Sequence, residues 1–350
     1  MKIGIYLNSQ YPAEEDAGAA LQLLRDLTAS ADRLDFDSIW VGEHHITHGY
    51  HFFPQLTLLS HLTAFSGEMD VGTNLVLLPL HRPVDIAEQV ALIDQACGGR
   101  FILTVGQGYR EEEFVALGVP YQERLARMLD GIEALRGLWS GEPFTHDGGY
   151  YAVEGAIVLP PPAREGGPPI WIGATADRAI RRGGRIGDGY MATPNADTAE
   201  IRRQVDLFNE ARAEAGLPLT DQLGRMLEVH CHPDRDEAFR RARPHLLRKY
   251  ASYASWGNLG TSKEQGAAPS SPSSVAAVDD ADAFAELARG RFVIGNPDDV
   301  VAGLVAQSTE AAMEHLAMRI SWPGSDPHHA AECLELLGNE VLPRVRAELG

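Results

Sequence analysis

Cysteine is scarce in this sequence, with only Cys97, Cys231 and Cys333 among 350 residues. An odd number of widely spaced cysteines argues against a disulfide framework and a cysteine-based zinc site, and it fits a reducing cytoplasm. The chain also lacks an apolar run long enough to cross a membrane, and its start, MKIGIYLNSQYP, has no cleavage site for export. We therefore expect a cytoplasmic protein whose first residues form a buried strand.

Basic residues are few relative to acidic ones. The chain has 30 Lys and Arg against 49 Asp and Glu, which gives a formal net charge of −19. A strongly acidic surface repels nucleic acids and anionic membranes, so small molecules or other proteins are the expected partners. The same charge also serves solubility alone, and that simpler explanation is the default.

Short apolar runs alternate with longer amphipathic stretches over almost the whole chain. The expected strands are residues 2–7, 38–43, 71–78, 101–106, 169–174, 189–193, 225–232 and 315–322. Eight repeats of strand and helix are the pattern of a closed barrel, and one such barrel fits this length. We predict an α/β fold, a single (β/α)8 TIM barrel domain with insertions that covers residues 1–350.

Two segments interrupt the alternation. Residues 141–168 contain strand-like aromatic pieces and a Pro-Gly-rich exit, which predicts a hairpin insertion on the surface. Residues 257–282 are rich in Ser, Pro, Ala and Gly and poor in large apolar residues, which predicts a mobile loop after strand seven. At the rim of a barrel such a loop would serve as an active-site lid, the alternative being a disordered insertion without a role.

Histidines stand at the end of the second expected strand, in the stretch GEHHITHGY over 42–50. Barrel chemistry sits at the carboxyl ends of the strands, so His44 and His45 fall on the functional rim. Strand alternation sends one side chain towards the barrel mouth and the other towards the surrounding layer. A metal site needs histidines that share a face, as His230 and His232 do, but no further ligands accompany them and we expect no metal.

A phosphate site is indicated where the fifth strand leaves through the turn Gly-Ala-Thr-Ala into a helix that opens near Asp177. Backbone N–H groups at such a turn and helix start hold phosphate without a lysine. The fourth strand ends in TVGQGYREEEF, where Gly106 and Gly108 allow a ligand close to the backbone.

Four motifs in this order, EHH, VGTNLVLLPLHRPVDIAEQVALIDQACGGRF, GQGYREEEFVALGVPYQERL and WIGATADRAIRRGGRIGDG, resemble the bacterial luciferase-like flavin monooxygenases. The similarity covers nearly the whole chain. It implies a (β/α)8 barrel that usually forms a homodimer.

The resemblance also implies roles for individual residues. His44 matches the catalytic histidine beside the flavin ring, and Asn74 and Leu75 match a third-strand site where members often have a non-prolyl cis peptide. The other cofactor-binding candidates are Gln107, Tyr109, Gly173, Ala174, Thr175 and Ala176. Two of these depart from luciferase: Gln107 stands where luciferase has a phosphate-binding arginine, and Thr175 replaces an acidic residue. Arg110 or Arg182 would then help the backbone amides to hold the phosphate.

The activity implied by the resemblance is oxygenation of a small organic or carrier-bound substrate. Reduced FMN from a separate flavin reductase would react with O2 to a C4a-hydroperoxyflavin, with His44 as acid and base, because an imidazole titrates near neutral pH. Glu43 would either orient His44 or form a structural salt bridge. An apolar pocket is expected from Phe52, Phe53, Tyr109 and Trp256, each of which is equally suited to simple packing.

Alternatives remain open at this stage. A deazaflavin-dependent oxidoreductase that transfers hydride shares the barrel and the GDG stretch, although that branch more often has an aspartate before a single histidine. A non-catalytic flavin-binding subunit and a metal-dependent hydrolase are the others. The flavin that binds, FMN or deazaflavin, discriminates between the two leading hypotheses.

Overall fold

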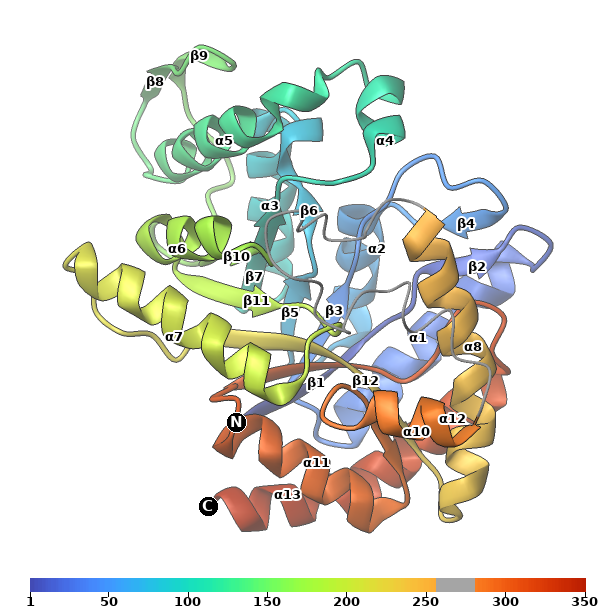
Figure 1. Cartoon of the computed structure of the whole chain (residues 1–350). Coiled ribbons are helices and arrows are strands. Elements are labelled where there is room, and N and C mark those ends of the chain that lie inside the picture. Colours follow the sequence, from blue (N-terminus) through green and yellow to red (C-terminus); the bar gives the residue numbers. More distant parts are fainter. Residues whose placement is uncertain (256–280) are drawn as a thin grey trace.

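Parallel strands form a barrel wall in the computed structural model, which describes residues 1–255 and 281–350 (Figure 1). Within those residues the eight wall strands are β1 (Lys2–Tyr6), β3 (Ser38–Val41), β5 (Asp70–Thr73), β7 (Phe101–Gly106), β10 (Ile170–Gly173), β11 (Gly189–Ala192), β12 (Leu223–Cys231) and β14 (His315–Arg319). Each coincides with or overlaps a strand expected from the sequence. The third expected strand is split, because Asn74 and Leu75 separate β5 from β6 (Val76–Leu77).

The sheet closes because β10 pairs with β7 on one side and with β11 on the other. At this junction Ile170 lies opposite Leu103. The first strand lies between the last and the second, with Ile5 opposite both Met318 and Ile39. All of these pairings are parallel, so the predicted (β/α)8 barrel is confirmed.

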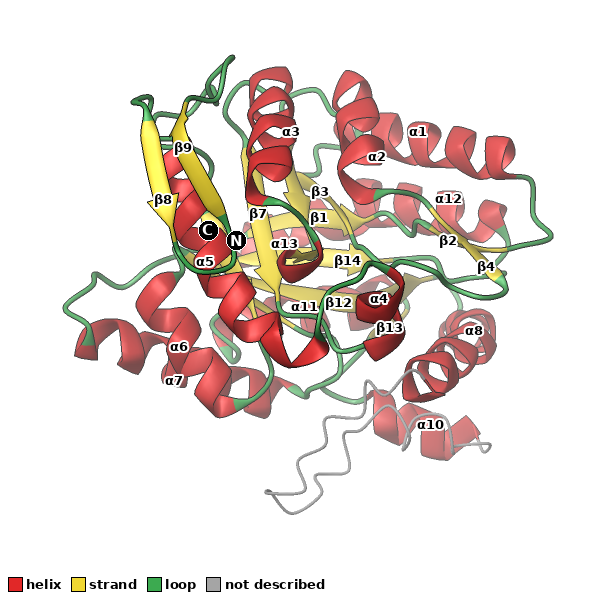
Figure 2. Ribbon diagram, turned by 90° about the horizontal axis from the view of Figure 1, so that it is seen from above, coloured by secondary structure: helices red, strands yellow, loops and turns green. Residues whose placement is uncertain are grey.

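Helices surround the wall, as the view from above shows (Figure 2). They include α1 (Ala17–Arg33), α2 (Gln55–Leu62), α3 (Pro83–Ala96), α5 (Arg124–Leu138), α6 (Asp177–Ile186), α7 (Thr198–Glu214), α11 (Pro297–Thr309), α12 (Pro327–Leu336) and α13 (Leu342–Leu349). Several begin at a side chain that accepts a backbone N–H bond: Asp16, Asp197 and Asn296 cap α1, α7 and α11. Such caps satisfy amides that the first turn leaves without partners.

Side chains fill the inside of the barrel as well as the layer between strands and helices. The inner cluster consists of Tyr6, Trp40, Ile102, Trp171, Met191, Met226 and Ala317. Space for the large rings comes from glycines, since a Cβ on Gly72 would lie 2.2 Å from the Trp40 ring. The barrel is therefore a packed core whose chemistry is confined to its ends.

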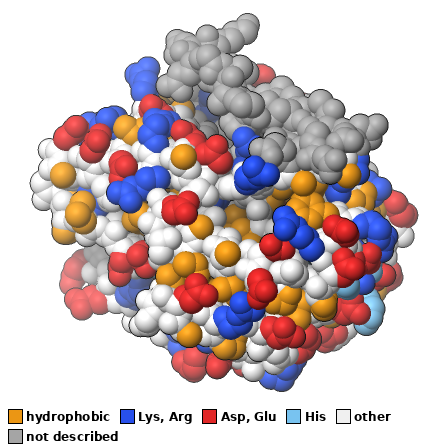
Figure 3. All heavy atoms as spheres, turned by 60° about the horizontal axis from the view of Figure 1, so that its bottom comes forward, with side chains coloured by type: hydrophobic (Ala, Val, Ile, Leu, Met, Phe, Trp, Pro, Cys, Tyr) orange, Lys and Arg blue, Asp and Glu red, His pale blue; other side chains and the backbone are white. Residues whose placement is uncertain are grey.

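The surface carries charges of both signs. On the face in Figure 3, acidic and basic side chains are interspersed, with hydrophobic side chains between them. Many of these charges are paired, for example Arg181 with Glu210 at 2.9 Å. In the described parts of the chain, no helix combines the length and the apolar character that crossing a bilayer requires.

The segment 141–168 contains an antiparallel pair, β8 (Phe144–Asp147) with β9 (Ala152–Ala156). Asp130 of α5 anchors this hairpin. Its carboxylate lies 2.5 Å from Nε2 of His146 and accepts the backbone N–H groups of Tyr150 and Tyr151 at 3.0 Å.

An excursion between the seventh and eighth wall strands contains α8 (Arg235–Ser255), α10 (Ala281–Ala288) and β13 (Val293–Gly295), which pairs with the end of β12. It has a small core of its own, made of Ala238, Ala242, Leu246, Tyr250, Phe284, Ala288, Phe292, Ile294 and Trp322. We call this the satellite core. The predicted lid begins in this excursion, but its residues 257–280 lie outside the described residues.

A buried charged cluster joins the excursion to the barrel. Glu228 of β12 is fully buried, contacts the Nζ atom of Lys249 in α8, and accepts the indole N–H of Trp322 at 2.6 Å. Arg319 of β14 lies nearby, over the ring of Tyr6 at 4.2 Å. Burial alone would raise the pKa of Glu228, but the positive charges of Lys249 and Arg319 outweigh it and hold this pKa below its usual value. The ionised carboxylate thus compensates buried positive charge.

Candidate active site

The candidate residues gather at the carboxyl ends of four neighbouring wall strands. His44 follows β3, Asn74 follows β5, Gln107 and Tyr109 follow β7, and the turn 173–176 follows β10. Parallel strands in a barrel place these ends on one face, which is the barrel mouth. The fold therefore brings together segments that the sequence separates by more than a hundred residues.

His44 is held between a carboxylate and aromatic rings. Its Nδ1 atom lies 3.0 Å from Oε1 of Glu113, and its Nε2 atom lies 3.4 Å from the hydroxyl of Tyr109. The ring of Phe52 meets the imidazole edge-on, with ring centres 5.4 Å apart. Only 10% of the His44 side chain is exposed. An imidazole in such a setting has a fixed orientation and little access to water.

Glu113 is the residue that orients His44. It is almost fully buried in α4 (Glu111–Ala116), where Oε1 also accepts the backbone N–H of His45 at 2.8 Å and the guanidinium of Arg110 at 3.0 Å. Burial alone would raise the pKa of Glu113, but the hydrogen bond with His44 and the nearby positive charges hold it below its usual range. An ionised Glu113 accepts a hydrogen bond from Nδ1 of His44, so Nε2, which lies 3.4 Å from the Tyr109 hydroxyl, is the nitrogen suited to proton exchange.

Glu43 does not orient His44, so that option from the sequence is wrong. Its Oε2 atom accepts the backbone N–H of Leu77 at 2.6 Å, while its Oε1 atom lies 2.9 Å from Nε2 of His81 and 3.3 Å from Nε2 of His45. Glu43 instead forms the structural salt bridge that was the other option, with His45 and His81 as its partners. The side chains of the adjacent histidines contact different carboxylates, His44 that of Glu113 and His45 that of Glu43. Both residues line one cavity, so the expected division between barrel mouth and surrounding layer stays a prediction.

The third strand end has the expected backbone feature, since the Asn74–Leu75 peptide bond is cis. The Nδ2 atom of Asn74 is buried without a hydrogen-bonding partner among the described residues. Leu75 packs over the fourth and fifth strand ends. A Cβ on Gly106 would lie 2.7 Å from its side chain, and one on Gly173 would lie 2.3 Å from it. Glycine is required at both positions for this contact.

The turn 173–176 leads directly into α6, which begins at Asp177 as predicted. Its N-cap residue, Ala176, offers no side-chain cap, so the first amides of the helix face the end of the turn. The carbonyl of Ala174 accepts the hydroxyl of Tyr190 at 2.8 Å, which fixes the turn. Arg203 bonds both oxygens of Asp177, at 2.9 and 3.0 Å, and brings a basic group to the helix start that sequence analysis missed.

Arg110 is an unsuitable phosphate ligand. Its guanidinium is buried and donates to Glu113 and to the carbonyl of His45, both at 3.0 Å. It therefore supports the His44 segment. Within residues 1–255 and 281–350, no side-chain hydrogen bond or ion pair holds Gln107, Thr175 or Arg182, and their binding roles stay predictions.

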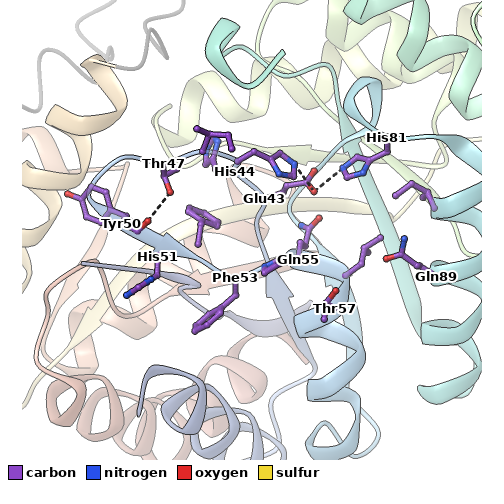
Figure 4. Close-up of a pocket in the computed structure, with 16 residues that line it drawn as sticks. Glu43, His44, Thr47, Tyr50, His51, Phe53, Gln55, Thr57, His81 and Gln89 are labelled. Atoms are coloured by element: carbon purple, nitrogen blue, oxygen red, sulfur yellow. Dashed lines mark hydrogen bonds and ion pairs between the residues drawn. The ribbon is translucent and has the colours of Figure 1, made fainter. Parts of the chain in front are cut away.

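A cavity of about 500 Å³ lies beside His44 (Figure 4). Phe52 and Phe53 line it, as expected, but much of its lining is polar, so the expected apolar pocket is not what the cavity forms. Tyr109 contacts His44 from elsewhere, and Trp256 lies outside the described residues. Glu43, His45 and His81 also line it. Among the described residues, no third His, Cys, Asp or Glu joins His230 and His232 in a ligand cluster.

A family model described as luciferase-like monooxygenase matches residues 1–315. The chain belongs to this family. Among curated relatives, the F420-dependent glucose-6-phosphate dehydrogenase of Microbacterium testaceum is 28% identical over 98% of both chains. The enzyme of the same name from Nocardia farcinica is 29% identical over 93% of this chain and 94% of its own.

Solved structures of this luciferase-like family show the same fold. Monooxygenase RslO1 from Streptomyces bottropensis has a TM-score of 0.83 at 22% identity, over 98% of this chain and 99% of its own. An F420-dependent secondary alcohol dehydrogenase, solved with an F420–acetone adduct, has a TM-score of 0.76 at 18% identity, over 99% of both chains. The family and these relatives identify the chain as an oxidoreductase.

Proposed function

We propose that this luciferase-like chain transfers a hydride between a deazaflavin of the F420 type and the alcohol or carbonyl carbon of a small substrate. The observation that carries this proposal is the similarity to F420-dependent dehydrogenases over nearly the full length of both partners. It favours the deazaflavin alternative from the sequence over oxygenation with FMN. We further propose that a sugar phosphate is the first substrate to test, because these relatives are named for glucose 6-phosphate.

The residues at the barrel mouth suit such a cofactor. Asn74 presents a buried amide N–H that lacks a partner among the described residues, and Leu75 offers an apolar face beside it. The uncapped start of α6 after residues 173–176 would hold a phosphate through backbone amides. Once bound, a deazaflavin supplies a ring carbon that accepts or returns a hydride.

His44 would move the proton in this reaction. Oxidation of an alcohol removes a hydride from carbon and a proton from oxygen, and Nε2 of His44 would accept that proton while Nδ1 keeps its bond to Glu113. The ionised Glu113 stabilises the imidazolium that results. In the reverse direction the imidazolium returns the proton to the carbonyl oxygen.

Cofactor binding tests the proposal. Isothermal titration with oxidised F420 and with FMN should give an F420 affinity at least about tenfold tighter, a difference of about 1.4 kcal/mol. Glucose 6-phosphate and a series of secondary alcohols are then added, and loss of the oxidised F420 absorbance reports turnover. Binding of FMN without binding of F420 would rule out the proposal.

Oxygenation with reduced FMN is the second candidate. Phe52 and Tyr109 surround His44 with aromatic rings, and oxygen chemistry also requires a site that excludes water. In that case a separate flavin reductase supplies the reduced FMN. Oxygen-electrode measurements with reduced FMN distinguish this candidate from hydride transfer with F420. Oxygenation requires oxygen consumption that depends on the substrate, whereas F420 turnover consumes no oxygen.

The role of Glu113 as a positioning residue is tested by Glu113→Gln. Glutamine keeps the shape but removes the charge that stabilises imidazolium, so kcat should fall about 10–10²-fold. Exposed Glu112 in the same helix gives a matched control, and Glu112→Gln should retain full activity. Partial recovery by Glu113→Asp would support the role of the carboxylate, whereas equal losses in the Gln variants at 112 and 113 would contradict it.

A further inference from the structure

Three potential metal ligands meet at the barrel mouth, beside His44. The ligand atoms of Glu43, His45 and His81 all lie within 4.8 Å of one another. Glu43 and His45 follow β3, while His81 comes from the loop before α3, so the cluster joins two neighbouring barrel segments. Both histidines turn Nε2 towards the same carboxylate oxygen, at 2.9 and 3.3 Å (Figure 4).

These separations match those between ligands of one small ion. In a tetrahedral zinc site with bonds of about 2.0 Å, neighbouring ligand atoms are about 3.3 Å apart. One carboxylate and two imidazoles are also a donor set that first-row transition metals accept and that Mg²⁺ and Ca²⁺ disfavour. Small side-chain adjustments would therefore admit a divalent ion.

Gln55 provides an independent sign of a missing positive partner. Its side chain is 2% exposed, and its Oε1 atom is buried without a hydrogen-bonding partner among the described residues. The amide cannot turn over freely, because its Nε2 atom donates to the carbonyl of Val41 at 2.6 Å. Figure 4 shows Gln55 below Glu43, with its oxygen pointing towards that carboxylate. Two acceptor atoms that face each other leave room for a cation between them.

The cluster is accessible. Glu43, His45, Gln55 and His81 all line the cavity of about 500 Å³ beside His44. The side chains of His45 and His81 are 27% and 24% exposed. An ion can thus reach the ligands without unfolding of the barrel.

We propose that Glu43, His45 and His81 bind one divalent transition-metal ion, with Oε1 of Gln55 as a further ligand. Zn²⁺ is favoured over Mn²⁺, Fe²⁺ and Co²⁺ by the general order of affinities for such donors. The ion would fix the segment that carries His44 against the start of α3. The proposed role is structural, because His44 is oriented by Glu113 and not by a ligand of the ion.

The metal itself is the probe. Chelator-treated protein is titrated with Zn²⁺ by calorimetry and with Co²⁺ by visible absorption, which reports the ligand geometry. We expect one equivalent of ion, bound with release of protons and more weakly at acid pH. His81→Ala should lower the affinity at least about 100-fold, because it removes one of three strong ligands.

His51 supplies the matched control, since it lines the same cavity but lies outside the cluster. His51→Ala should leave the affinity unchanged. Circular dichroism of both variants before the titration establishes that they are folded. Absence of stoichiometric binding, or equal affinity in wild type and His81→Ala, would overturn the proposal and identify the cluster as a hydrogen-bonded network without an ion.

Discussion

Replacing His44 with alanine is expected to reduce turnover by about 10²–10⁴-fold, the range associated with loss of a general acid or base. The imidazole is the group at the barrel mouth whose orientation is fixed by a buried carboxylate, through the 3.0 Å contact with Glu113. The variant should still bind the cofactor with nearly unchanged affinity, because the turn 173–176 and the Asn74–Leu75 segment remain intact. Single-turnover absorbance measurements of bound F420, with saturating substrate, report the rate directly.

His45→Ala is the comparison that separates chemistry from structure. The side chain of His45 pairs with Glu43, while only its backbone N–H reaches Glu113, so its imidazole belongs to the supporting network. Burial acts to lower the pKa of His45, but the hydrogen bond and charge of Glu43 outweigh it and raise this pKa. The His45 variant should thus lose stability more than turnover. The opposite pattern, with His45 essential for the rate and His44 dispensable, would refute the assignment.

Replacing Glu228 with glutamine is expected to destabilise the fold by about 3–5 kcal/mol, the usual result of removing one partner from a buried ion pair. Arg319 would keep its buried positive charge without the carboxylate that compensates it. Lys249, whose pKa burial already lowers to about 7, would lose the partner that favours its charged form. Urea unfolding followed by circular dichroism measures the change. The control is Glu210→Gln, which removes an exposed pair with Arg181 and should cost less than about 1 kcal/mol.

Acid should reduce the difference between Glu228→Gln and wild type. A carboxyl group whose folded pKa is depressed contributes stability above its usual pKa of 4.5, and the contribution disappears as the pH falls through the folded value. The two proteins should therefore converge in stability below about pH 4.5. A difference that is independent of pH would show that the loss comes from packing and not from charge.

The sequence was sufficient for the barrel because its signal is repeated. The alternation between apolar runs and amphipathic stretches predicted the positions of all eight wall strands. The main error was the third, which was predicted as one strand but is divided by Asn74 and Leu75. Local chemistry was also predictable where it depends on neighbours along the chain. The helix start at Asp177 follows from such short-range geometry.

The partner of His44 was not predictable in the same way. Glu113 belongs to the run Glu111–Glu112–Glu113, which is typical of a solvated first helical turn, and two of the three are indeed exposed. Only the closed barrel brings the fourth strand end beside the second. Glu43 was one of two options that the sequence left open, a partner of His44 or a structural salt bridge, and it contacts His81 instead of His44. The choice between FMN and deazaflavin likewise depends on relatives, since no single residue identifies either ring.

The satellite core has a consequence for how this protein can change over evolutionary time. Its apolar cluster is distinct from the main core, although β13 contributes Val293 to the main core and pairs with the last residues of β12. Substitutions at Phe284 or Phe292 should therefore act first on the excursion and reach the barrel mainly through Trp322 and the Glu228–Lys249 contact. A lineage can then vary the excursion, which adjoins the barrel through Glu228 and Lys249, and keep the His44 machinery unchanged. In this domain the excursion is the part that can diversify, and the barrel mouth around His44 is the part that can stay the same.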